Sequence, residues 1–108
     1  MSKQSKYLAD FTIAGMRYWD GSLVVCQLKP GQKLDLVAEP DNAYDPDAVA
    51  IYYKEHKLGF VPREFNGLPA QLLRFGHKKV LECRTLKVDE RAEPWDQIRV
   101  GLYFIDKS

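Results

Sequence analysis

The chain consists largely of short apolar or alternating segments that are separated by turn-forming residues. Residues 33–38 place Leu34 and Leu36 on one face, and residues 98–104 alternate in the same way near the end of the chain. Such alternation predicts half-buried β-strands. Further strands are expected where strand-forming residues cluster, at 8–14, 22–28, 48–53, 57–61 and 79–88. The pattern therefore predicts a mainly β protein with six or seven short strands.

The strand pattern is interrupted between residues 62 and 75. The apolar residues of this stretch approximate one face of a helix: Leu68, Leu72, Leu73 and Phe75. Pro69 suits a first helical turn, and Gly76 suits the position that follows a helix. We expect one or two short helices here.

The length of 108 residues fits one domain of common size. So many short strands with a small helical insertion cannot form two separate layers at this length. A partly closed barrel of the OB type is the economical solution, and an open antiparallel sheet with a helix packed on one face is the alternative. Residues 1–7 are expected to form a flexible N-terminal tail, and residues 8–108 the barrel domain.

The formal net charge is only +1, although 29% of the residues are charged. Proteins that coat long stretches of nucleic acid usually carry a basic excess. Any nucleic-acid contact of this chain is therefore expected to be short and to neutralise few phosphates. The chain has no apolar run long enough to span a membrane, and its N-terminus lacks a signal-peptide core. We expect a cytoplasmic protein without a membrane partner.

The residue types that usually hold metals or catalyse reactions are scattered along the chain. Cys26 and Cys83 each lie in an apolar segment and are expected to be small buried hydrophobic residues. His56 and His77 lie in turns flanked by lysines and are expected at the surface. The chain also lacks closely spaced zinc ligands, a phosphate-binding loop and the known nucleophile motifs. We therefore expect no metal, no cofactor and no intrinsic enzymatic activity.

Residues 39–48, Glu-Pro-Asp-Asn-Ala-Tyr-Asp-Pro-Asp-Ala, form the most informative segment. Proline, aspartate and asparagine favour turns because they fix φ or bond to the local backbone. A turn alone does not explain Tyr44, an aromatic residue between acids. A calcium loop is a further alternative, but the order of Asp41, Asp45 and Asp47 differs from that of an EF-hand.

A second cluster, Gly-Met-Arg-Tyr-Trp-Asp-Gly at residues 15–21, places Arg17 beside aromatic residues at a strand-to-loop corner. Aromatic faces stack on bases, and guanidinium groups hold phosphates. The alternative interpretation is an aromatic core cluster beside a solvated arginine.

These two clusters, followed by Leu-Gly-Phe-Val-Pro-Arg at residues 58–63, resemble the HIRAN domain family. The family's pattern runs from a Gly-x-x-Tyr corner, through a Glu-Pro-x-Asn-x-Tyr-Asp-x-x-Ala loop, to an Ile/Leu-Gly-aromatic-x-Pro turn. The resemblance covers roughly residues 8–105, and the loop motif is the most specific of the three.

The resemblance implies a modified OB barrel that captures the 3′ end of single-stranded DNA, as in fork-remodelling helicases of the SWI/SNF type. Small stand-alone bacterial proteins also carry the domain, and this chain is similar to those. By resemblance, the following residues would contact the strand end: Arg17, Tyr18, Asn42, Tyr44, Asp45, Phe60, Arg63 and, with a looser alignment, Trp95. The chain lacks a helicase motor, so a helicase or other DNA-processing partner, such as a nuclease, would supply any remodelling activity. DNA repair is the process that the family suggests.

The hypothesis for the site is chemical. A 3′ terminus differs from internal DNA by a free hydroxyl, which a carboxylate accepts in a charge-assisted hydrogen bond. Asp45 is expected in this role, while Tyr18 and Tyr44 stack on bases and Arg17 and Arg63 hold phosphates.

The alternative function is a protein-interaction module that uses an exposed edge strand or an aromatic patch of Tyr18, Trp19, Tyr44 and Phe60. The absence of a strong basic excess favours this alternative. The preference between DNA and RNA stays open.

Overall fold

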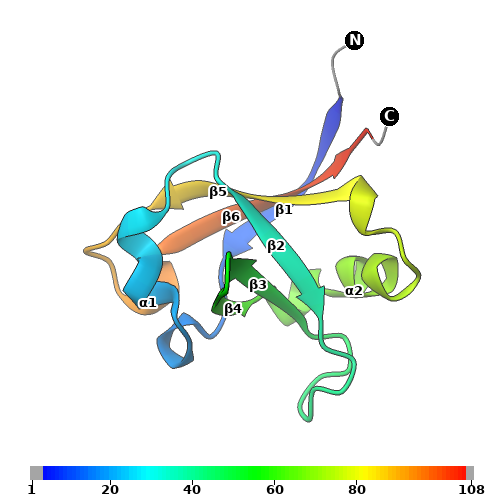
Figure 1. Cartoon of the computed structure of the whole chain (residues 1–108), viewed down its shortest axis with the longest axis horizontal. Coiled ribbons are helices and arrows are strands. Elements are labelled where there is room, and N and C mark those ends of the chain that lie inside the picture. Colours follow the sequence, from blue (N-terminus) through cyan, green and yellow to red (C-terminus); the bar gives the residue numbers. More distant parts are fainter. Residues whose placement is uncertain (1–3, 107–108) are drawn as a thin grey trace.

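The computed structural model describes residues 4–106. Within this range six strands form one antiparallel sheet in the order β1-β6-β5-β2-β3-β4 (Figure 1). The strands are β1 (Ser5–Thr12), β2 (Lys33–Ala38), β3 (Val49–Tyr53), β4 (His56–Phe60), β5 (Leu81–Val88) and β6 (Ile98–Ile105). The helices are α1 (Gly21–Val24) and α2 (Gly67–Arg74). Short 3-10 turns also occur: η1 (Met16–Tyr18), η2 (Val25–Gln27), η3 (Arg63–Phe65), η4 (Lys78–Val80) and η5 (Pro94–Asp96).

The sheet curls into a partly closed barrel. Strand β2 takes part in both halves of it, because residues 33–34 pair with β5 and residues 35–38 pair with β3. At the opposite side Ala14, which follows β1, forms an isolated bridge with Phe60 of β4. The two N–H···O distances of this bridge are 2.9 and 2.8 Å. The expected mainly β, OB-like barrel of six or seven strands is confirmed, with six strands among the described residues.

Glycine is required at the bridge that closes the barrel. Gly59 has φ +154°, a conformation that L side chains rarely adopt, and a Cβ there would lie 2.3 Å from the carbonyl oxygen of Ala14. The Leu-Gly-Phe segment is thus a close approach between β4 and the chain that leaves β1.

The core fills the inside of the curled sheet. Its largest fully buried apolar side chains come from β3, β4 and β6, from η1 and from the residue that follows β1. They are Ile13, Met16, Ile51, Leu58, Ile98 and Leu102. The alternation read in β2 is confirmed, since Leu34 and Leu36 are buried and Lys33 and Asp35 are exposed. Among the described residues, no helix has the length and apolarity needed to cross a membrane.

The segment 22–28 is not the strand that its composition predicted. It forms α1 and η2 instead, with Val24, Val25 and Leu28 buried and Leu23 exposed. A short apolar run does not distinguish a buried strand from a short helical segment, because both are compatible with its periodicity. The same turn exposes Cys26, so the expectation of a buried thiol was wrong there and is confirmed only for Cys83.

The start of the first strand and the buried face of the helix also differ from the expectation. Strand β1 begins at Ser5 and pairs with β6 as far as Ile105, so residues 5–7 of the predicted tail are strand. Residues 1–3 of that tail lie outside the described residues. In the helical insertion Pro69 lies in the first turn of α2 and Gly76, at φ +82°, follows the helix. The buried residues of α2 are Pro69 and Ala70, whereas Leu68 and Phe75 of the predicted apolar face are exposed.

Candidate functional site

A hollow of about 240 Å³ opens beside the bridge that closes the barrel. One wall comes from the loop between β2 and β3, and the other comes from the end of β4 and the start of η3. The polar and aromatic residues around it are Asn42, Tyr44, Asp45, Phe60, Arg63 and Asn66. Three segments that are far apart in the sequence therefore meet at this hollow.

The loop is shaped by bonds between its own side chains and its backbone. Oδ1 of Asn42 accepts the N–H groups of Tyr44 at 2.9 Å and of Asp45 at 3.1 Å. Oδ1 of Asp45 in turn accepts the N–H of Asp47 at 2.9 Å. Such bonds fix turns without help from the rest of the fold. They leave the ring of Tyr44 projecting into solvent, with 87% of the residue exposed.

Asp45 is held at the edge of the hollow by residues of the helical insertion. Its Oδ2 accepts a hydrogen bond from Nδ2 of Asn66 at 2.9 Å, and Nε of Arg63 lies 3.6 Å from the same oxygen. The N–H of Asp47, the Asn66 amide and the Arg63 charge together hold the pKa of Asp45 below its ordinary value. Asp45 is therefore a carboxylate at neutral pH, and two oxygens with about four acceptor positions leave room for a further donor.

Arg63 closes the other side of the hollow. Its Nη2 donates to the carbonyl oxygen of Tyr44 at 2.8 Å, which ties η3 to the loop. The side chain is still 71% exposed, so the remaining N–H donors of its guanidinium fork face solvent. Such a group is suited to bind a phosphate.

A largely buried lysine contacts residues of all three segments. Nζ of Lys57 lies 2.5 Å from Oε2 of Glu39, and it also lies 3.9 Å from the ring centroid of Trp19 and 4.4 Å from that of Phe60. Only 13% of the Lys57 side chain is exposed. Oε1 of Glu39 accepts Nδ2 of Asn42 at 3.1 Å. The charge of Lys57 is thus connected through Glu39 to the residue that shapes the loop.

The pKa of Glu39 reflects two opposing effects. Burial raises the pKa, but the hydrogen bonds from Lys57 and Asn42 and the lysine charge outweigh burial and lower it. The carboxylate is therefore ionised where it supports the loop.

The remaining predicted site residues lie outside the lining of the hollow. Arg17 and Tyr18 belong to η1, two and three residues after Gly15 of the hollow, and the Arg17 guanidinium carbon lies 5.4 Å from the Tyr18 ring centroid. Tyr18 is 74% exposed. Trp95 lies in η5, which packs against η1. The fold thus gathers Asn42, Tyr44, Asp45, Phe60 and Arg63 around one hollow, and places the other three beside one another on adjoining turns.

Sequence reasoning missed the residues that support the site from behind. Asn66, Lys57 and Trp19 were not assigned to it, and Glu39 was noted only as part of the loop motif. Asn66 is buried and directly precedes α2, where an asparagine usually caps the helix, yet its side chain makes no capping bond and is directed to Asp45 instead. No local signal reveals this, because the two residues are 21 positions apart.

The chain is similar in sequence to a plant nuclease homolog. The Fanconi-associated nuclease 1 homolog of Oryza sativa subsp. japonica is 29% identical over 99 residues, which are 88% of this chain and 10% of that protein. The chain therefore spans about a tenth of the length of this relative.

Two crystal structures share the fold. A protein from Lactobacillus plantarum matches with a TM-score of 0.78 at 24% identity, and the match covers 97% of this chain and 99% of that one. The HIRAN domain of human HLTF matches with a TM-score of 0.63 at 16% identity, covering 99% of this chain and 78% of that chain. The family model described as HIRAN domain matches residues 6–104. Since this match includes nearly the whole chain, the protein belongs to the HIRAN domain family, whose domains are generally DNA-binding modules.

Proposed function

We propose that this domain binds a single DNA strand at its 3′-hydroxyl end and holds the terminal nucleotide at the hollow between residues 42–48 and 60–63. The observation that carries the proposal is the convergence of an exposed aromatic ring, an ionised carboxylate and an exposed guanidinium group around that hollow. A strand end offers a partner to each of these groups: a base for the ring, a hydroxyl for the carboxylate and a phosphate for the guanidinium group.

The size of the hollow suits part of a nucleotide. Pockets that enclose a small molecule usually measure about 300–1,000 Å³, and this hollow measures about 240 Å³. It would take the terminal sugar and leave the base outside, against the ring of Tyr44. Stacking of this kind contributes about 1–3 kcal/mol per base.

Asp45 would select the kind of end. Its carboxylate accepts a hydrogen bond from a 3′-hydroxyl, but it repels a 3′-phosphate in the same place. Arg63 would bind the phosphate on the 5′ side of the terminal nucleotide. Arg17, Tyr18 and Trp95, on the turns that adjoin the hollow, would lie along the strand end itself.

The biological process can be inferred from the kinds of protein that resemble this domain. The domain binds, and a nuclease or a helicase would supply the chemistry at the captured end. The similarity to a Fanconi-associated nuclease homolog supports a role in DNA processing and repair.

The test compares ligands rather than variants, because Asp45 also holds the loop. Three 5′-labelled probes are titrated against the parent protein by fluorescence anisotropy: a short strand with a 3′-hydroxyl, the same strand with a 3′-phosphate, and a blunt duplex. We expect the hydroxyl strand to bind roughly tenfold or more tightly than the phosphate strand, as the loss of a charge-assisted hydrogen bond predicts. Equal affinity for both ends would show that the end is not recognised.

One variant, with a control, tests the aromatic wall of the hollow. Tyr44→Leu removes only a ring that projects into solvent, and it should weaken binding of the hydroxyl strand by about 1–3 kcal/mol. Tyr7→Leu is the matched control, because Tyr7 is also exposed but lies on β1 outside the hollow. If the parent protein binds none of the probes, the exposed aromatic residues would point to the protein-interaction alternative.

A further inference from the structure

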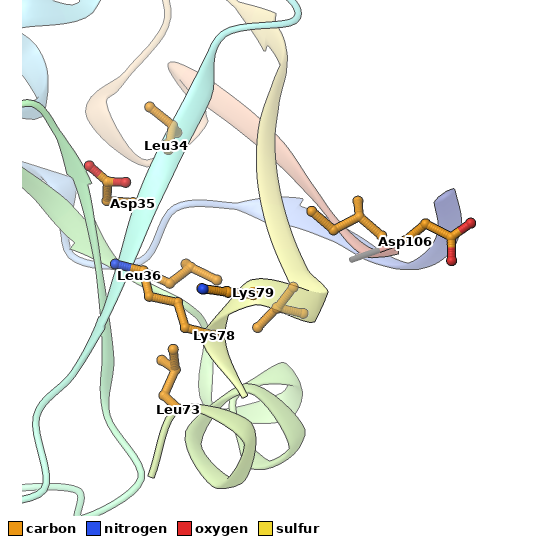
Figure 2. Close-up of a pocket in the computed structure, with 9 residues that line it drawn as sticks. Leu34, Asp35, Leu36, Leu73, Lys78, Lys79 and Asp106 are labelled. Atoms are coloured by element: carbon orange, nitrogen blue, oxygen red, sulfur yellow. The ribbon is translucent and has the colours of Figure 1, made fainter. Parts of the chain in front are cut away.

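A second and larger opening lies where β2 and β5 separate. The two strands pair only at residues 33–34 and 83–84, and the gap beyond this pairing measures about 490 Å³. Leu34, Leu36 and Leu81 are buried at its base. Figure 2 shows the side chain of Lys78, from the η4 turn, extending between Leu36 and Leu73, with the side-chain nitrogen of Lys79 beside it.

The two lysines carry charge that the fold does not neutralise. Both are exposed, and in the described part of the chain neither forms an ion pair. Asp35 and Asp106 also line the opening, but their carboxylates lie toward its two ends in Figure 2. The aliphatic stems of the lysines cover apolar surface while their ammonium groups face water.

These lysines belong to the most basic segment of a nearly neutral chain. Residues 74–79 read Arg-Phe-Gly-His-Lys-Lys, with three permanent positive charges, whereas the whole chain has a net charge of +1. Phe75 within this segment is 69% exposed. Proteins commonly bind single-stranded nucleic acid through exposed aromatic rings interleaved with cationic side chains.

The segment is joined to the loop between β2 and β3 by direct contacts. Nη2 of Arg74 lies 3.3 Å from the carbonyl oxygen of Pro46 and 3.7 Å from Oδ1 of Asp47. Asp47 also donates its N–H to Asp45 at the hollow. Arg74, at the start of the basic segment, and the hollow therefore contact the same loop.

We propose that Phe75, Lys78 and Lys79 form a second contact for the same DNA strand, on the 5′ side of the nucleotides bound at the hollow. Lys78 and Lys79 bind two backbone phosphates, and Phe75 stacks on a base. This inference rests on the proposed function for the position of the strand end, and it adds a path for the rest of the strand.

The separation of the two contacts sets the length of strand required. Asn66, at the hollow, precedes α2, and the basic segment starts at its last residue, so the eight residues of the helix separate them by about 12 Å. A strand of only two or three nucleotides would occupy the hollow alone. OB barrels bind about 4–16 nucleotides, which is enough to reach both contacts.

The test measures binding of a three-nucleotide and a twelve-nucleotide strand, each with a 3′-hydroxyl, at several salt concentrations. The variant Lys78→Gln/Lys79→Gln removes two charges from exposed side chains and should leave the fold intact, which circular dichroism verifies. We expect the slope of log affinity against log salt for the long strand to become shallower by about 1.4, which is about 0.7 for each phosphate lost. Binding of the short strand should not change.

A matched control removes two charges elsewhere. Lys29→Gln/Lys87→Gln also changes two exposed lysines, which lie toward the other end of β5. This control should leave the slope unchanged for both strands. A third variant, Phe75→Ala, should weaken binding of the long strand by about 5- to 150-fold and leave binding of the short strand unchanged.

The outcomes separate this inference from the proposed function. If the parent protein prefers the hydroxyl end but the Lys78/Lys79 variant keeps the full slope, the second contact is wrong and the strand-end site stands. If the slope decreases as expected while hydroxyl and phosphate ends bind equally, the second contact stands and end recognition is wrong. A control variant that loses as much slope as the Lys78/Lys79 variant would reduce the effect to net charge and overturn the inference.

Discussion

At position 59 the barrel has room for a hydrogen atom and not for a methyl group. Gly59→Ala would bring a Cβ to 2.3 Å from the backbone oxygen of Ala14, at a φ of +154°. We expect this variant to lose at least about 1–3 kcal/mol of unfolding free energy from strain alone, and to bind DNA more weakly because the bridge supports Phe60. Urea unfolding measures the first effect.

Gly67→Ala is the control for that substitution. No atom lies within 4 Å of a Cβ built at Gly67, and the residue is in α2. Alanine there should stabilise the protein by about 0.4–1 kcal/mol. Equal stability of the two variants would contradict the close approach at Gly59.

The two cysteines provide another prediction for single residues. Burial raises the pKa of Cys83 to about 12, whereas Cys26 is exposed. Because the thiolate is the reactive form, we expect a thiol reagent at pH 8 to modify one cysteine in the folded protein and two after denaturation. Cys26→Ser should abolish the reaction in the folded state; rapid modification of that variant would contradict the burial of Cys83.

Among the structural elements, the loop between β2 and β3 combines local and distant support. Its turns come from Asn42 and Asp45 acting on their own backbone. Its attachment to the strands of the barrel comes in part from Glu39, which accepts a hydrogen bond from Lys57 of β4. Arg63 and Asn66 attach it to the helical insertion. A loop with only the first kind of support would keep its shape but not its position over the hollow.

Lys57→Met tests the second kind of support. Methionine keeps the approximate volume but leaves the partly buried Glu39 without its cation. We expect a loss of about 1–2 kcal/mol in unfolding free energy, less than the about 3–5 kcal/mol for a fully buried pair, with weaker binding of a 3′-hydroxyl strand. Lys57→Arg keeps the charge and should recover most of the binding; failure of arginine to do better than methionine would show that charge is not what matters at this position.

At the scale of the whole molecule, acid should destabilise the fold through its paired carboxylates. Burial raises the pKa of both Glu39 and Glu82. Hydrogen bonds outweigh it: Glu39 accepts them from Lys57 and Asn42, and Glu82 from Arg84 and Lys33. The pKa of each carboxyl therefore lies below the ordinary 4.5. A group whose pKa is lower in the folded state stabilises the protein above its unfolded pKa. That stability is lost as the pH falls through the folded pKa.

The measurement is the unfolding free energy at a series of pH values from 7 to about 3. We expect a plateau above pH 5 and a decline once the pH falls below about 4.5. The double variant Glu39→Gln/Glu82→Gln should be less stable at pH 7 and should decline less steeply in acid. An equally steep decline in the double variant would assign the acid sensitivity to other carboxylates.

The main features of this barrel could be predicted from local patterns. Alternation in β2 and β6 marked strands because a half-buried strand must alternate. The turn chemistry of Asn42 and Asp45 could be inferred because it acts over two or three residues. The glycine at position 59 was part of the motif, although its reason, the contact with Ala14, was not visible there.

The sequence by itself thus determined the class of fold, the family and the residues of the loop, since each depends on short-range order. Tertiary structure alone decided that residues 22–27 are helical, that Cys26 is exposed, and that Asn66 and Lys57 support the loop. Hydrogen bonds and ion pairs between distant residues depend on how the sheet curls and closes, and no local pattern records that geometry. The hollow exists because the curl brings the β2–β3 loop, the end of β4 and the start of α2 together.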